Sequence, residues 1–201
     1  MKWLPPLPDV RVLTLVAGPN GSGKSTLTAA LFPRGSVTVI DPDAMARELN
    51  PEHPDHAAAG AARQAIRWRR ALIARRESFV VETTLAGNGV FPLVQHAIEA
   101  GYQIHLIYVA LRDPELQIER VRLRALQGGH SVPDSDIRRR YERSLYNAPK
   151  VMRMAHFSHV YDNSATQWRP VLRVQQGRVL WHAASLPSWA RRIQIELESV
   201  Q

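Results

Sequence analysis

Residues 18–25 constrain this chain more than any other segment. They read GPNGSGKS and match the pattern G-x-x-x-x-G-K-[S/T] at every fixed position. The apolar run 11–17 precedes them, and a helical pattern begins at Lys24. A glycine-rich turn between a buried strand and a helix directs backbone N–H groups and the helix N-terminus at a phosphate group. The sequence therefore predicts a phosphate-binding loop (P-loop) in an α/β fold.

The residue types of this loop predict its ligand. Glycines let the backbone close around an anion, Lys24 reaches the β- and γ-phosphates of a nucleoside triphosphate, and the Ser25 hydroxyl ligates Mg²⁺. We therefore expect ATP or GTP to bind here with Mg²⁺. The predicted nucleotide-binding residues are Gly18, Pro19, Asn20, Gly21, Ser22, Gly23, Lys24, Ser25 and Thr26.

Length and composition limit the number of domains, the cellular compartment and the class of ligand. The 201 residues suit one domain over residues 1–201, and no apolar run approaches the roughly 20 residues of a membrane span. The chain has no cysteine, and residues 1–10 do not read as a signal peptide, so we expect a cytoplasmic protein with no membrane contact. The net charge of +8 comes almost wholly from arginine, which favours phosphorylated ligands or nucleic acid.

Strand and helix patterns alternate along the rest of the chain. Strands are expected at 11–17, 36–40, 78–81, 103–111 and 158–161. Helices are expected at 24–32, 44–49, 55–76, 91–100, 114–127 and 135–147. This order predicts a kinase-like P-loop NTPase, with three α/β/α layers around a mostly parallel five-stranded sheet. A C-terminal hairpin and a helix from Ser188 are expected over about 169–201.

Two aspartates follow the second predicted strand, at the edge where open α/β sheets bind ligands. We expect this strand, at 36–40, to lie next to the P-loop strand. A phosphoryl acceptor needs a carboxylate that takes up the proton of its hydroxyl, and we assign that role to Asp43. The alternative is that Asp41 or Asp43 only caps the helix at 44–49.

Glu82, Thr83 and Thr84 follow the strand at 78–81. Glu82 stands where an acidic side chain contacts Mg²⁺ or its water shell, so Ser25 and Glu82 are the predicted metal ligands. Thr84 is placed to hold the acceptor. The predicted acceptor site consists of Asp43, Glu82, Thr83 and Thr84.

Arginines flank a glycine pair and predict a lid over about 120–143. Gly128 and Gly129 resemble its hinge. We expect Arg124, Arg139 and Arg140 to reach the transferred phosphoryl group, where positive charge stabilises the transition state and lid closure excludes water. The alternative for each arginine is exposed helix charge.

Other candidates are weaker. Asp162 and Asn163 follow the strand at 158–161, but Asp-Asn-Ser is also a good turn sequence. The histidines show no metal-ligand spacing, and only His130, within the predicted lid, is of interest. The tryptophans at 68, 168, 181 and 189 are interpreted as core or surface aromatics, not as platforms that stack bases.

Several segments together resemble the zeta-toxin-like P-loop kinases, in particular the short bacterial branch known as predicted ABC-type ATPases. The resemblance covers most of residues 11–164. The matching segments are GPNGSGKST at 18–26, VIDPDAMARELNP at 39–51, VVETTLAG at 80–87, RVRLRALQGGHSVP at 120–133, IRRRYERSL at 137–145 and VYDNS at 160–164.

This resemblance carries its own expectations. It implies that Asp43 is the base and that Glu82 and Thr84 belong to the site. Toxin-type members phosphorylate the 3′-hydroxyl of the amino sugar in UDP-N-acetylglucosamine and are neutralised by a small antitoxin, so a small-molecule acceptor and an antitoxin are the implied partners. This chain reads Glu-Thr-Thr where the toxin pattern has Glu-Gly-Thr.

Three other functions stay open at this point. The chain could phosphorylate a different nucleotide or a polynucleotide end, since arginines also suit a polyanionic acceptor. It could be an ATPase that needs no acceptor. It could also be a nucleic-acid-binding module that uses bound nucleotide as a switch, which is less favoured.

Overall fold

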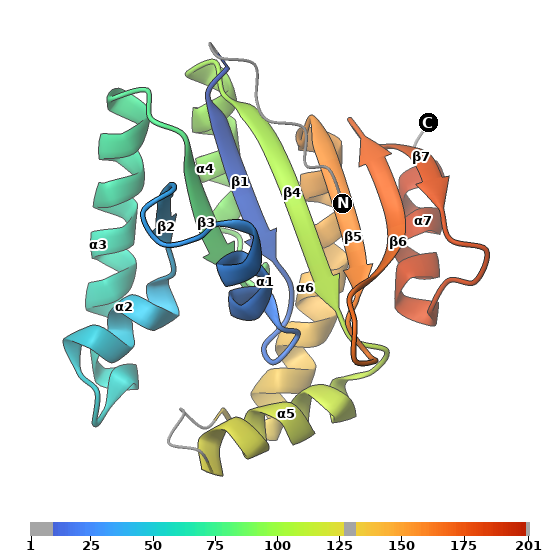
Figure 1. The fold of residues 1–201 in the computed structure, drawn as a ribbon, viewed down its shortest axis with the longest axis horizontal. Coiled ribbons are helices and arrows are strands. Elements are labelled where there is room, and N and C mark those ends of the chain that lie inside the picture. The colour runs from blue at the N-terminus through green and yellow to red at the C-terminus, as the bar shows by residue number, and fades with distance from the viewer. Residues whose placement is uncertain (1–9, 127–131, 200–201) are drawn as a thin grey trace.

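The protein has an α/β fold, in which helices cover both faces of one β-sheet (Figure 1). The computed structural model describes residues 10–126 and 132–199. Its strands are β1 (Val12–Ala17), β2 (Thr38–Ile40), β3 (Phe79–Thr83), β4 (Gln103–Ala110), β5 (Phe157–Asp162), β6 (Arg169–Gln175) and β7 (Arg178–His182). Its helices are α1 (Lys24–Leu31), α2 (Pro42–Leu49), α3 (Pro54–Ala74), α4 (Val90–Glu99), α5 (Pro114–Leu126), α6 (Asp134–Met154) and α7 (Ser188–Glu198). These elements confirm the predicted fold class.

The sheet has seven strands in the order β2-β3-β1-β4-β5-β6-β7, so the predicted count of five is wrong. The five strands β2, β3, β1, β4 and β5 are parallel to their neighbours. Strand β6 pairs antiparallel with β5, and β7 pairs antiparallel with β6. The hairpin joins the sheet because Val171, Leu172 and Val174 of β6 are buried and extend the core. Most of β7 is exposed, as befits an edge strand.

The second strand does not lie next to the P-loop strand, and this expectation is corrected. β3 separates β2 from β1, with Val80 of β3 paired to Thr14 of β1 and to Val39 of β2. Burial explains the order. β1 is buried at every position and takes a central place, whereas β2 is only three residues long and exposes Thr38. The residues after β3 therefore come nearest to the P-loop.

Alternate residues of the strands enter two hydrophobic clusters, one on each face of the sheet. Leu13 and Leu15 belong to the larger cluster, with side chains from α4, α6 and α7. Val16 belongs to the smaller cluster, together with Leu27 of α1. Figure 1 shows α1 in front of β1 and β3, with α4 and α6 behind the sheet. The phosphate-binding turn thus leads into a helix that packs on its own strand.

Helix α6 is longer than predicted and ends at Met154 instead of 147. Pro149 lies inside it and removes one backbone donor, which normally ends a helix. The helix continues because Ala148, Val151 and Met152 are fully buried against the sheet. Packing therefore outweighs the local penalty, and this long helix begins within the predicted lid range of 120–143.

Candidate active site

The P-loop passes close under β4 and β3, and its glycines are required there. The Gly18 N–H donates to the Thr83 carbonyl at 3.2 Å. Gly18 has φ +145°, and a Cβ built on it would lie 1.9 Å from the Val109 carbonyl oxygen. A Cβ at Gly23, where φ is +94°, would lie 2.4 Å from Asn163 Nδ2. Side chains at these two positions would displace the loop from its strand and from the loop after β5.

Gly18→Ala is expected to destabilise the protein by about 2–4 kcal/mol, because the new methyl group meets a backbone oxygen that cannot move aside. Urea unfolding followed by circular dichroism measures the effect. Gly60→Ala is the matched control, since Gly60 lies inside α3 with nothing within 4 Å of the added Cβ. That change should be neutral or stabilise by up to about 1 kcal/mol. Equal midpoints for the two variants would contradict the proposed clash.

Lys24 is the first residue of α1, and its side chain lies over the P-loop. Gly23 precedes it in the left-handed conformation, and no side chain of residues 10–126 or 132–199 caps the helix N-terminus. The Lys24 ammonium donates to the Pro19 carbonyl at 3.0 Å. Burial lowers the pKa of Lys24, although the carboxylates of Glu82 and Asp43 act in the opposite direction. An uncapped helix N-terminus beside a partly desolvated ammonium is suited to bind phosphate oxygens.

Ser25 and Glu82 face each other between α1 and β3. Ser25 Oγ donates to Glu82 Oε2 at 2.9 Å. The register Val16↔Glu82 sets this contact, because β1 leads into the P-loop while β3 runs parallel beside it. Glu82 is 5% exposed, and burial raises the pKa of its carboxyl, with Asp41 adding to the effect. The structure thus brings together the two predicted metal ligands.

The aspartates after β2 have different surroundings. Asp41 is the N-cap of α2, since its Oδ1 accepts from the Asp43 N–H at 3.0 Å, and Arg47 lies 3.8 Å from its other carboxylate oxygen. Burial raises the pKa of Asp41, and the charge of Asp43 adds to this. The Asp43 side chain is exposed and makes no hydrogen bond or ion pair with any described residue. Capping therefore occupies Asp41 and leaves the carboxylate of Asp43 available.

A first cavity of about 560 Å³ collects most of the predicted site. It lies between the P-loop, the end of β3, helices α2 and α3, and the start of α6. The predicted residues that line it are Asn20, Gly21, Lys24, Ser25, Asp43, Glu82, Thr83, Thr84, Arg124 and Arg140. The hydroxyls of Thr83 and Thr84 accept from the backbone N–H groups of Leu85 and Ala86. These two side chains therefore hold the turn after β3 and also border the cavity.

A second cavity, of about 590 Å³, also has Lys24 in its lining. Gly23, Lys24, Ser25 and Thr26 border it, as do Arg120, Asn163 and Trp168 from later in the chain. Lys24, Ser25 and Arg124 line both cavities. The two spaces thus meet at the P-loop, as a triphosphate between a nucleoside and an acceptor requires.

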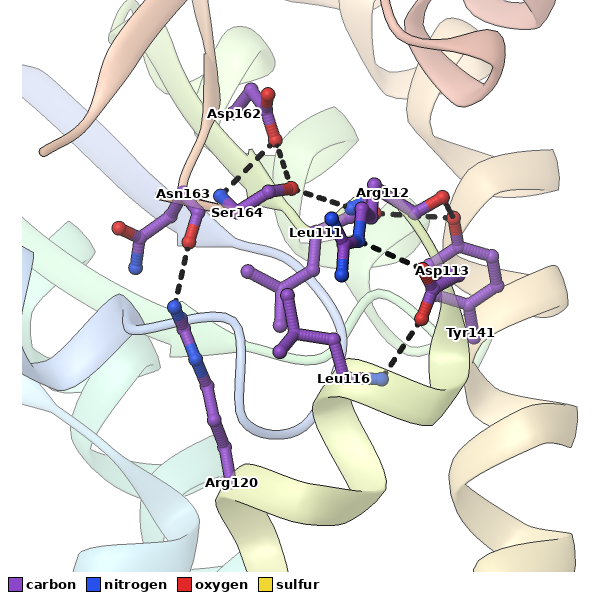
Figure 2. Close-up of polar contacts among 9 residues, drawn as sticks. All are labelled: Leu111, Arg112, Asp113, Leu116, Arg120, Tyr141, Asp162, Asn163 and Ser164. Atoms are coloured by element: carbon purple, nitrogen blue, oxygen red, sulfur yellow. Dashed lines mark hydrogen bonds and ion pairs between the residues drawn. The ribbon is translucent and has the colours of Figure 1, made fainter. Parts of the chain in front are cut away.

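Hydrogen bonds connect the loop after β5 to α5 and to the end of β4 (Figure 2), and Asn163 connects the same loop to the P-loop. Arg120 of α5 donates to the Asn163 carbonyl at 2.9 Å, and Asn163 Nδ2 donates to the Ser22 carbonyl at 2.9 Å. Ser164 Oγ donates to Asp162 and accepts from the Arg112 N–H at 2.7 Å. This network connects the ends of β4 and β5 to α5, so one wall of the second cavity is fixed by hydrogen bonds.

The predicted lid arginines divide into two groups. Arg124 lines both cavities, and Arg140 lines the first and lies 3.9 Å from Asp136. Arg139 lines neither cavity and donates to Asp136 Oδ1 at 2.7 Å, one turn away on α6, so its role in transfer stays a prediction. Gly128, Gly129 and His130 lie outside the described residues.

Some residues of the site were not found by sequence reasoning. Arg69 of α3 lines the first cavity, but nothing distinguishes it from the neighbouring arginines in the sequence. Trp168 lines the second cavity, whereas Trp189 is core, as expected. Leu85 is buried with φ +58°, and the Asn147 side chain donates to its carbonyl at 2.8 Å. A leucine in the left-handed conformation leaves no signal in the sequence.

No described helix is long and apolar enough to cross a membrane. Residues 10–126 and 132–199 also contain no group of three or more histidine, cysteine, aspartate or glutamate side chains that could hold a metal ion by themselves. A single carboxylate beside a P-loop hydroxyl is instead the sparse ligand set that Mg²⁺ uses when phosphate oxygens complete its coordination.

The fold and the site define a class of protein. A mostly parallel sheet carries a P-loop at its centre, acidic side chains stand at the carboxyl ends of β2 and β3, and the first cavity lies beside them. This is the arrangement of a P-loop kinase, an enzyme that transfers phosphoryl groups. The family model described as zeta toxin matches residues 6–168. The chain therefore belongs to the zeta toxin family.

The chain is also similar to individual proteins in sequence or in structure. A protein of Haemophilus influenzae, described only as uncharacterized, is 36% identical over 125 residues, which are 62% of this chain and 88% of that protein. The PezAT chromosomal toxin–antitoxin system of Streptococcus pneumoniae contains a similar structure, with a TM-score of 0.60 and 15% identity over 97% of this chain and 80% of that chain. At that identity the likeness shows the fold alone.

The complex of AvrRxo1-ORF1 with AvrRxo1-ORF2 is similar as well. With sulphate ions bound, it matches with a TM-score of 0.68 and 14% identity, over 94% of this chain and 76% of that chain. The same complex with ATP matches with a TM-score of 0.67, again at 14% identity, over the same shares of the two chains. Both comparisons show a common fold.

Proposed function

We propose that this protein transfers the γ-phosphoryl group of ATP or GTP to a hydroxyl of a small acceptor bound in the first cavity. The observation that carries the proposal is the carboxylate of Asp43. It has no partner among the described residues, and it borders the same cavity as Lys24 and Glu82. The phosphate-binding loop and a carboxylate that is available as a base therefore border the same cavity. Transfer of a phosphoryl group to an acceptor requires this arrangement.

The residues present fit a nucleoside triphosphate with Mg²⁺. The glycines at 18, 21 and 23 let the loop pack closely against β4, α5 and Asn163, and no described side chain caps the N-terminus of α1, where a phosphate group can bind. Mg²⁺ would be held by Ser25 and Glu82, and it supplies positive charge that neutralises phosphate oxygens. The nucleoside would occupy the second cavity, beside Asn163 and Trp168. An ATP-bound complex of the same fold supports ATP as the donor.

The transfer step uses the chain's own side chains as follows. Asp43 accepts the proton of the acceptor hydroxyl as its oxygen forms a bond to the γ-phosphorus. The bond from that phosphorus to the β–γ bridging oxygen breaks, and the nucleoside diphosphate leaves. Lys24, Arg124 and Arg140 supply positive charge around the transferred group. Thr84 borders the same space and orients the acceptor.

The acceptor we propose is a small hydroxylated metabolite such as a nucleotide sugar, with UDP-N-acetylglucosamine as the first compound to test. The family supports this choice, and the cavity volume of about 560 Å³ lies in the range of small-molecule sites. A small antitoxin is the proposed protein partner, because a toxin–antitoxin system shares the fold. We further propose that residues 1–201 form one domain that acts in the cytoplasm.

The test is transfer to an acceptor panel. The protein is incubated with ATP, Mg²⁺ and hydroxylated metabolites that include UDP-N-acetylglucosamine, and mass spectrometry detects products heavier by one phosphate. We expect one class of acceptor to be phosphorylated and ATP consumption to depend on its presence. Steady ATP hydrolysis without any phosphorylated acceptor would reject the kinase proposal and favour an ATPase.

A further inference from the structure

The hairpin of β6 and β7 has one buried face and one face that no described helix covers. Helices α6 and α7 pack on the buried face, where Leu172 and Val174 enter the larger hydrophobic cluster (Figure 1). The smaller cluster, on the other face of the sheet, includes Leu27 of α1. It contains no residue of β6 or β7 within the part of the chain that the structure describes. The hairpin therefore extends the sheet beyond the reach of α1.

The uncovered face carries aromatic and basic side chains in register. Successive strand residues point to opposite faces, so Arg173, which lies between the buried Leu172 and Val174, points away from the core. Arg173 pairs with His159 of β5 on one side and with Trp181 of β7 on the other. These last three residues thus form one row across three neighbouring strands.

A second row lies beside the first. Gln175 pairs with Arg178 next to the hairpin turn, and Phe157 begins β5 two residues before His159. Phe157 is 39% exposed and Trp181 is 42% exposed. We call the two rows the platform, which consists of Phe157, His159, Arg173, Gln175, Arg178 and Trp181. None of these residues lines either cavity.

The positive charge of the platform is not balanced by the protein. Residues 157–182 contain three arginines and one acidic side chain, Asp162, which lies 3.2 Å from Arg169. Arg173 and Arg178 are exposed, and neither forms an ion pair with a carboxylate of residues 10–126 or 132–199. The platform is therefore complementary in charge to an anionic partner.

Aromatic rings stand next to these cations. The Arg173 guanidinium lies 5.4 Å from the centre of the Trp181 ring. Burial lowers the pKa of His159, and the charge of Arg173 adds to this, so the imidazole is an uncharged flat ring at neutral pH. Exposed rings beside arginines on an open sheet suit single-stranded nucleic acid, because bases stack on the rings while the cations contact phosphates.

We propose that the platform binds single-stranded nucleic acid. Bases stack on Trp181 and Phe157, and Arg173 and Arg178 contact the phosphates. A duplex fits poorly, since its bases are stacked on one another and are not available to the rings. The net charge of +8 adds long-range attraction for a polyanion. This binding does not depend on the proposed phosphoryl transfer, because the platform lies outside both cavities.

Fluorescence anisotropy of labelled strands of about 12 nucleotides tests the proposal. The protein is saturated with Mg²⁺ and a non-hydrolysable ATP analogue, which occupies the P-loop, and is titrated into oligo-U, oligo-dT or a DNA duplex of the same length. We expect at least one single strand to bind about tenfold more tightly than the duplex. Preference for oligo-U indicates RNA and preference for oligo-dT indicates DNA, and either supports the proposal. Equal or tighter binding of the duplex would overturn it.

Trp181→Leu removes the ring and should weaken single-strand binding by about tenfold or more. Trp181→Phe keeps a ring and should retain most of the affinity, which separates stacking from a general loss of structure. Trp68→Leu is the matched control, since Trp68 of α3 is 46% exposed and lies outside the platform. Wild-type affinity in Trp181→Leu, or an equal loss in Trp181→Phe, would overturn the proposal.

Arg173→Gln tests the phosphate contact. It should weaken binding and lower the slope of log affinity against log salt by about 0.7, the share of one contact on a single strand. Arg70→Gln, an exposed arginine of α3, is the control and should keep the wild-type slope. An unchanged slope in Arg173→Gln would contradict the proposal. So would a dimer in analytical ultracentrifugation that Trp181→Leu converts to a monomer, because a second copy would then cover this face.

Discussion

Lys24→Ala is expected to reduce phosphoryl transfer by about 10³-fold or more. The Lys24 ammonium lies over the P-loop, 3.0 Å from the Pro19 carbonyl, and borders both cavities. Because it is partly desolvated, its interaction with phosphate oxygens is stronger than at an exposed position. The loss should appear in kcat and in the affinity for Mg·ATP, measured by steady-state kinetics and by calorimetry.

Lys150→Ala is the control for this variant. Lys150 lies in α6 with its ammonium 3.5 Å from the centre of the Tyr146 ring, and it borders neither cavity. Its removal should leave turnover nearly unchanged. If Lys24→Ala kept wild-type turnover, the chemistry would have to lie outside the P-loop, and the proposed site would be wrong.

Asp43→Asn is expected to lower kcat by about 10²–10⁴-fold and to change the affinity for Mg·ATP little. The asparagine has nearly the same shape but cannot take up the acceptor's proton. The carboxylate has no structural partner among the described residues, so the fold should keep its stability. Single-turnover transfer to the identified acceptor measures the chemical step, and calorimetry measures nucleotide binding.

Two further variants of the same segment separate catalysis from helix capping. Asp41→Asn keeps an acceptor for the Asp43 N–H and should therefore retain the start of α2. Glu48→Gln removes an exposed carboxylate from the same helix and should be neutral. If Asp43→Asn transferred phosphate at the wild-type rate, the base would be a different carboxylate of the cavity, with Asp41 and Asp55 the ones to examine next.

The segment around the P-loop folds as its local sequence predicts. The strand at 11–17, the P-loop and the helix from Lys24 appear as predicted, because one short segment contains both the apolar strand and the glycines that its turn requires. The contact of Ser25 with Glu82 also matches, since it needs only that β3 lie beside β1. The nearest neighbours of the motif were thus accessible from the sequence.

Predictions that depended on longer-range packing were less accurate. The predicted pairing of β2 with β1 is wrong, because a three-residue strand carries too little hydrophobic signal to indicate its place in a sheet. The sequence predicts a hairpin outside a five-stranded sheet, whereas β6 pairs with β5 and extends the sheet. Arg139 and Arg140 are adjacent in sequence, yet successive helical residues point about 100° apart, so only Arg140 borders the cavity.

The sequence by itself determined that this protein has a P-loop in an α/β kinase fold and that acidic residues follow the neighbouring strands. It could do so because a phosphate-binding turn uses backbone conformation and side chains that are close together along the chain. Only the tertiary structure decided which distant side chains share a space with Lys24. Asp43, Arg69 and Trp168 lie in separate elements, and their proximity to the P-loop depends on how the helices and loops pack around the sheet.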